Sequence, residues 1–139
     1  MMYALDTNIV SFWLRGLYNL ESQFDTVLKA GHTLIIPPMT YYEILRGLYA
    51  HNSSNKLQIF EAACLKLGLQ DMTKGDWVQA AKLYAECRKI NHTMEDADLL
   101  QAAFCLQNRY TLVTHNPKHF IHINTLTIED WTNSSSLIS

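Results

Sequence analysis

Short, almost wholly apolar segments alternate along this chain with longer segments in which apolar residues recur at helical spacing. The short segments are residues 2–5, 33–36, 110–114 and 126–128, and a polar residue or a proline follows each of them. Strands that are apolar on both faces are typical of a parallel sheet covered by helices on both sides. The pattern therefore predicts an α/β fold, a three-layer α/β/α sandwich around a short, mostly parallel central sheet.

The segments between these strands are predicted to be helices, and local residues indicate where each helix begins. We expect helices over residues 9–14, 20–28, 40–51, 57–67, 77–90 and 95–106. Thr7 or Asn8 is the expected N-cap of the first helix. Thr40 precedes Glu43 by three residues, which is the spacing of a capping box at the start of the third helix.

With 139 residues, 48% of them hydrophobic, the chain has the length and composition of one domain with its own core. We expect residues 1–132 to form this domain and residues 133–139 to form a frayed tail. No apolar run reaches the ~18 residues that a membrane helix needs, and the N-terminal segment does not have the pattern of a signal peptide. The three cysteines are widely spaced within apolar helical segments, which indicates a reducing compartment. A cytoplasmic protein with no membrane partner is therefore expected.

Acidic side chains gather where a parallel sheet places its ligand site, beyond the carboxyl ends of the strands. Asp6 follows the first strand, and Glu43 lies about one turn into the helix after the second. Asp96 and Asp98 open the helix that precedes the third strand. Carboxylates that converge repel one another unless a cation neutralises them, and all-oxygen sites suit Mg²⁺ or Mn²⁺. The pattern predicts metal-assisted hydrolysis of a phosphodiester by an activated water.

Each of these acids also has a purely structural interpretation. Asp6, Asp96 and Asp98 could each favour the start of a helix by capping it or by interacting with its dipole. Glu43 could do no more than complete the capping box. A phosphoaspartyl phosphatase is a further alternative for Asp6, but that chemistry needs a second aspartate where this chain has Asn8.

Five stretches of the sequence resemble the motifs of PIN-domain ribonucleases, and specifically of the VapC-type toxins of bacterial toxin–antitoxin pairs. Residues 3–11 (YALDTNIVS) resemble the opening of these proteins, and residues 42–47 (YEILRG) resemble their E-hydrophobic-x-x-G helix. Residues 96–103 (DADLLQAA) resemble the D-x-x-I-A-A segment, and residues 112–120 (LVTHNPKHF) the V-T-x-N-x-x-x-F turn. Residues 126–131 (LTIEDW) match how many such chains end. The resemblance covers essentially the whole chain, in family order and at family spacing.

The resemblance implies a PIN fold and an endoribonuclease that depends on Mg²⁺ or Mn²⁺. It implies that Asp6 and Asp98 are metal-holding catalytic acids, with Glu43 as the acid of the second motif. Asp96 matches an additional acid that only some members have, and we expect Glu43 and Asp96 to bind the ion together with Asp6 and Asp98. The implied substrate is RNA, either transfer RNA or ribosomal RNA, and no motif in the sequence distinguishes the two.

Four further polar residues are implied to support these acids. Thr7 and Thr114 match hydroxyl groups that hold the carboxylates, and Asn8 stands beside the first acid. Asn116 departs from the pattern, because many PIN nucleases have a fourth acid at this position. An asparagine can hydrogen-bond a carboxylate or a water but brings no charge. We therefore expect one metal ion rather than two in the resting state.

The charge of the chain is compatible with RNA binding once the predicted site is set apart. The net charge is −2, but without the four site acids nine acidic side chains remain against eleven basic ones. A bound divalent cation would offset half of the charge of the four acids. Arg46 and Lys118 lie next to the motif residues and are candidate contacts to RNA phosphates.

The resemblance also implies two protein partners, a cognate VapB-like antitoxin and a second copy of the chain in a homodimer. Leu48, Tyr49 and Leu57 are expected to help form a groove for an antitoxin helix. The alternative function is a non-catalytic PIN module that only binds RNA or a partner protein, and Asn116 favours that alternative.

Overall fold

Strands and helices alternate along the chain as the sequence pattern predicts. The computed structural model describes residues 1–132, so the predicted frayed tail at 133–139 lies outside the described residues. In chain order the elements are β1 (Met2–Leu5), α1 (Thr7–Leu14), α2 (Leu20–Lys29), β2 (Thr33–Ile35), α3 (Pro38–Ala50), α4 (Ser54–Lys66), α5 (Lys74–Lys89), α6 (Asp96–Asn108), β3 (Thr111–Val113), the 3₁₀-helix η1 (Pro117–Phe120) and β4 (Ile128–Glu129). Within residues 1–132, no helix is long and apolar enough to cross a membrane.

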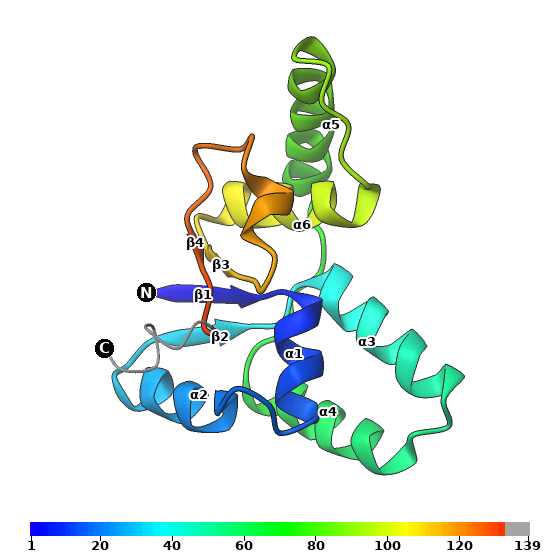
Figure 1. The fold of residues 1–139 in the computed structure, drawn as a ribbon, viewed down its shortest axis with the longest axis vertical. Coiled ribbons are helices and arrows are strands. Elements are labelled where there is room, and N and C mark those ends of the chain that lie inside the picture. The colour runs from blue at the N-terminus through cyan, green and yellow to red at the C-terminus, as the bar shows by residue number, and fades with distance from the viewer. Residues whose placement is uncertain (133–139) are drawn as a thin grey trace.

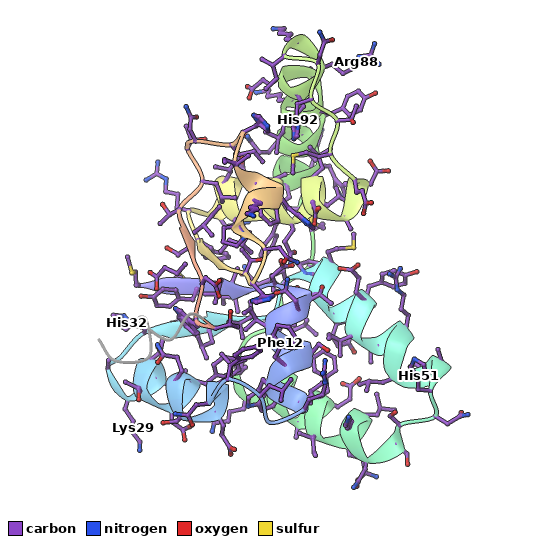
Figure 2. All side chains as sticks on the ribbon, viewed as in Figure 1. Phe12, Lys29, His32, His51, Arg88 and His92 are labelled. Atoms are coloured by element: carbon purple, nitrogen blue, oxygen red, sulfur yellow. The ribbon has the colours of Figure 1, made fainter. Side chains whose placement is uncertain are left out.

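The central sheet has the strand order β2-β1-β3-β4, and every neighbouring pair is parallel. Tyr3 in β1 pairs with Leu34 in β2 on one side and with Thr111 in β3 on the other. The carboxyl ends of these three strands therefore meet at the same edge. Lys29 and His32 precede β2 and mark the opposite, amino-terminal edge (Figure 2).

The sheet separates two hydrophobic cores, which makes the molecule three-layered. Successive side chains of a strand point to opposite faces. Leu5 packs with α1, α2 and α4 in one core, whereas Ala4 packs with α5 and α6 in the other. Figure 1 shows α1, α2 and α4 on one side of the sheet and α5 and α6 on the other. The predicted α/β/α fold is confirmed.

Two predicted helix caps are wrong. Asp6, rather than Thr7 or Asn8, is the N-cap of α1, and its carboxylate accepts a hydrogen bond from the Thr7 N–H at 2.9 Å. A carboxylate that follows β1 directly is already within reach of the first helical N–H groups, so the helix begins at Thr7, one or two residues earlier than expected.

The predicted capping box of α3 is also absent. The helix begins at Pro38, because proline at the first helical position needs no N–H partner and has its φ already set. Thr40 is therefore inside the first turn and fully buried, and its hydroxyl donates to the Leu5 carbonyl at 2.8 Å. Glu43 is thus free of any capping role and can face the edge of the sheet.

Candidate active site

Asp6 is the most highly connected acidic side chain of the predicted site. Its Oδ1 accepts from the Thr7 N–H at 2.9 Å and from Gln101 Nε2 at 3.0 Å. Its Oδ2 accepts from the Thr114 hydroxyl at 2.7 Å. The donors come from α1, α6 and the turn after β3, and three donors from three elements fix the orientation of one carboxylate.

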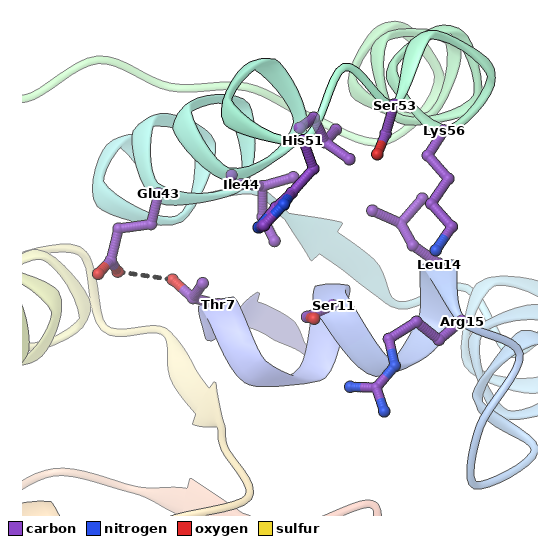
Figure 3. A pocket seen from close by; sticks show the side chains of 11 residues that line it. Thr7, Ser11, Leu14, Arg15, Glu43, Ile44, His51, Ser53 and Lys56 are labelled. Atoms are coloured by element: carbon purple, nitrogen blue, oxygen red, sulfur yellow. Dashed lines mark hydrogen bonds between the residues drawn. The ribbon is translucent and has the colours of Figure 1, made fainter.

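Glu43 reaches the same edge from α3. Its Oε1 accepts from the Thr7 hydroxyl at 2.7 Å, so Thr7 holds Asp6 with its backbone and Glu43 with its side chain (Figure 3). Its Oε2 lies 3.5 Å from Nη2 of Arg46, which also stacks over the Tyr42 ring at 5.2 Å from the ring centroid. Arg46 is more than half exposed, so this ion pair contributes little to stability.

Asp98 joins the group from the first turn of α6. Nδ1 of His119 lies 3.2 Å from its Oδ2. Burial raises the pKa of Asp98; the neighbouring charges of Asp6, Glu95 and Glu43 raise it further, and His119 lowers it. The negative charges of Asp6 and Glu43 thus act on Asp98, which places the three carboxylates near one another.

Asp96 stands apart from this group. It is exposed at the first position of α6, and within residues 1–132 its side chain makes no hydrogen bond or ion pair. Glu95, which the sequence interpretation passed over, is the neighbouring residue that acts on Asp98.

The turn after β3 completes one wall of the site. The Asn116 N–H donates to Oγ1 of Thr114 at 3.1 Å, so this hydroxyl is oriented toward Asp6 by the backbone that follows it. The Asn8 side chain accepts from the His115 N–H at 3.2 Å and ties the turn to α1. Asn116 itself is exposed.

Two pockets open beside the acids. One, of about 310 Å³, is lined by Lys118 and His119 together with Glu95 and Asp98. The other, of about 350 Å³, begins at Thr7 and Glu43 and lies between α1, α3 and the start of α4 (Figure 3). Besides Thr7 and Glu43 it is lined by basic, hydroxyl and apolar side chains, namely Ser11, Arg15, His51, Ser53 and Lys56, with Leu14, Ile44 and Leu48.

Sequence interpretation missed Gln101. It is 2% exposed on α6 and donates to both Asp6 and Thr40. A signal was present in the sequence, since an amide stands alone among apolar residues between Leu99 and Cys105. It also takes the place of the isoleucine in the D-x-x-I-A-A motif that this segment resembles.

The donor set fits a hard divalent cation for which the protein supplies only some of the ligands. Within the described residues, no three His, Cys, Asp or Glu side chains stand where they could hold a metal ion by themselves. Mg²⁺ commonly takes one or two carboxylates and completes its octahedron with water and substrate phosphate. Asp98, with the carboxylates of Asp6 and Glu43 that act on it, supplies oxygen donors and negative charge, which is what such an ion requires.

The fold and the site together define an α/β protein with an acidic site at the carboxyl edge of a four-stranded parallel sheet. The family model for the PIN domain matches residues 3–125, and the chain therefore belongs to the PIN domain family. A curated relative, Ribonuclease VapC1 of Haemophilus influenzae (strain R2866), is 24% identical over 133 residues, covering 95% of this chain and 99% of the relative.

Solved structures agree with this assignment. VapBC-1 from nontypeable Haemophilus influenzae matches with a TM-score of 0.84 at 24% identity, over 96% of this chain and 100% of that one. VapBC2 from Rickettsia felis, bound to a DNA fragment from their promoter, matches with a TM-score of 0.84 at 25% identity, over 94% of this chain and 99% of that one. The PIN fold predicted from the sequence is confirmed.

Proposed function

We propose that this chain is a Mg²⁺- or Mn²⁺-dependent endoribonuclease toxin of the VapC type, which hydrolyses RNA phosphodiester bonds and is inhibited by a cognate VapB-like antitoxin. The observation that carries the proposal is the gathering of Asp6, Glu43 and Asp98 at the carboxyl edge of the sheet, with Thr7 and Thr114 holding their oxygens. A relative named Ribonuclease VapC1 and structures named VapBC support the substrate class and the partner.

In this proposal Asp6 and Asp98 are the residues that hold the ion, and Glu43 is the third acid. A bound Mg²⁺ would supply an activated water and neutralise charge on the scissile phosphate. Thr7 and Thr114 keep the carboxylate of Asp6 in one orientation, so no rearrangement of that side chain is needed when substrate enters.

Two features of the donor set bear on the number of ions. Asn116 brings no charge to the turn after β3, which supports one ion at rest rather than two. Asp96 is exposed, and within residues 1–132 its side chain makes no hydrogen bond to the other acids. The proposal that it takes part in catalysis therefore rests on the motif resemblance alone.

The decisive experiment is a cleavage assay with purified chain that has never been in contact with an antitoxin. We expect RNA to be cut in Mg²⁺ buffer and the cognate antitoxin to stop the cutting. A binding-only PIN module would shift RNA in a gel without cutting it, and that result would contradict the proposal. Sequencing of the cleaved ends would then show whether transfer RNA or ribosomal RNA is the substrate.

Arg46 and Lys118 are proposed to contact RNA phosphates on either side of the acids. We expect Arg46→Ala or Lys118→Ala to weaken RNA binding and to lower the slope of log affinity against log salt by about 0.7, as for one lost contact to a single strand. Binding is measured in EDTA so that the RNA stays intact. Lys29→Ala is the matched control, because Lys29 is exposed at the opposite edge of the sheet (Figure 2). An unchanged slope in both site variants would contradict the assignment.

The antitoxin partner is proposed on surface chemistry. The pocket between α1, α3 and α4 contains Leu48 and ends at Glu43, so an antitoxin segment seated there would also cover Glu43. The proposal of a second copy as partner rests on the resemblance to VapC-type toxins. A monomeric mass in sedimentation would contradict the dimer.

A cytoplasmic location agrees with three free, buried cysteines.

A further inference from the structure

Gln101 is a buried amide that joins the three elements carrying the acids. Its Nε2 donates to Oδ1 of Asp6 at 3.0 Å and to Oγ1 of Thr40 at 2.7 Å. The Thr40 hydroxyl gives its own hydrogen to the Leu5 carbonyl, the last residue of β1. Among residues 1–132, the Oε1 atom of Gln101 is the one buried side-chain N or O atom without a hydrogen-bond partner.

The orientation of this amide follows from its neighbours. A carboxylate can only accept, and Thr40 has already used its hydrogen, so both must face the NH₂ group rather than the carbonyl of Gln101. That orientation leaves Oε1 unpartnered, and a buried acceptor without a partner destabilises a fold. An apolar side chain of the same length would avoid this cost. The value of Gln101 therefore lies in its two N–H groups.

We propose that Gln101 is a positioning residue that holds the Asp6 carboxylate for metal binding and fixes the spacing of the two helices that carry the other acids. Thr40 stands three residues before Glu43 in α3, and Gln101 stands three residues after Asp98 in α6. Positions three apart lie on the same face of a helix, so the Thr40–Gln101 hydrogen bond lies one turn away from each acid. The inference rests on the proposed metal-dependent function.

The test replaces the amide by an apolar side chain of equal length, Gln101→Met. We expect the Kd for Mn²⁺, measured by calorimetry on the purified chain, to rise by about 10–100-fold, as for other groups that orient metal ligands. The melting temperature in EDTA should change little, because removal of the unpartnered Oε1 offsets the loss of the two N–H donations to Asp6 and Thr40. Gln107→Met is the matched control on the same helix, since Gln107 is exposed, and its Kd should equal that of the unmodified chain. Gln101→Leu is the second variant if methionine packs poorly.

A lower melting temperature with an unchanged Mn²⁺ Kd would show a structural role only and would overturn the inference. Failure of the proposed function looks different, because the unmodified chain would then bind no Mn²⁺ or would bind it without cutting RNA. A second measurement tests the position of Asp6 and needs no bound metal. In a crystal structure of Gln101→Met, a rotated Asp6 carboxylate supports the inference, and an Asp6 carboxylate that keeps its orientation overturns it.

Discussion

Asp6→Asn should lower RNA cleavage by at least about 10³-fold while the protein stays folded. The substitution removes a charge that helps to hold the ion, and several kcal/mol of lost charge stabilisation corresponds to about three powers of ten in rate. Asp6 accepts hydrogen bonds with both of its oxygens, whereas asparagine has only one acceptor oxygen. The NH₂ group of the asparagine must therefore face a donor, either the Thr114 hydroxyl or the pair formed by the Thr7 N–H and Gln101. Initial cleavage rates of the two proteins, purified side by side, provide the measurement.

Circular dichroism and thermal unfolding serve as the control for folding. Because the variant is purified in the same way, it also reports any contaminating ribonuclease. Activity within tenfold of the unmodified chain would rule out Asp6 as a metal-holding residue.

Asp98→Asn should cause a comparable loss of cleavage but should stabilise the metal-free protein. Burial, and then the charges of Asp6, Glu95 and Glu43, raise the pKa of Asp98 above its ordinary value of 3.8. A raised carboxyl pKa means that the folded state binds the proton more tightly, so this contribution to stability is full below pH 3.8 and is lost as the pH rises through the folded pKa. At pH 7 the charged Asp98 is therefore unfavourable, and the neutral variant should melt at a higher temperature in EDTA.

This gain in melting temperature should shrink as the pH is lowered toward 4, where Asp98 itself becomes neutral. Asp96→Asn is the matched control, because Asp96 lies two residues away on the same helix and is exposed. It should show no such gain. A lower melting temperature for Asp98→Asn at pH 7 in EDTA would contradict the repulsion inferred for the three acids.

The contrast between Asp96 and Asp98 shows what could be predicted from the sequence and what was missed. Both open the same helix, but residues two apart point about 200° away from each other around the axis, so only one of them can face the site. Glu95, three residues before Asp98, is on the correct side. Helical phase shows that Asp96 and Asp98 point in different directions, and the packing of α6 beside Asp6 decides which of them lies near it.

The sheet and its acidic edge were predictable because they follow from chain-wide patterns. Apolar runs predicted the four strands. Because the strands are parallel, Asp6 after β1, the helix α3 after β2 and the start of α6 before β3 meet at one edge of the sheet. The start of α3 and the buried polar contacts were not predictable, because tertiary contacts decide them. Thr40 has the local sequence of a cap, but its hydroxyl is used on the Leu5 carbonyl, and Gln101 has a role only because α6 packs beside Asp6.

Removing divalent metal should reduce cleavage to the level of Asp6→Asn, and added Mn²⁺ should restore it. The expectation follows from how few protein ligands the site offers. Within residues 1–132 no complete cage is formed, so an ion held by one or two carboxylates, water and phosphate is open to exchange with EDTA. The assay compares initial rates before chelation, after chelation and after Mn²⁺ is returned in excess.

Stability gives an independent readout of the same event. An ion that binds only the folded chain stabilises it by about 2.7 kcal/mol when its concentration is one hundred times the Kd. Mn²⁺ should therefore raise the melting temperature of the unmodified chain and of Asp96→Asn, and should raise that of Asp98→Asn far less. If cleavage resists the chelator while Mn²⁺ still shifts the melting temperature, then the ion binds without serving the reaction. Attack on the phosphodiester would in that case have to come from the side chains of the chain itself.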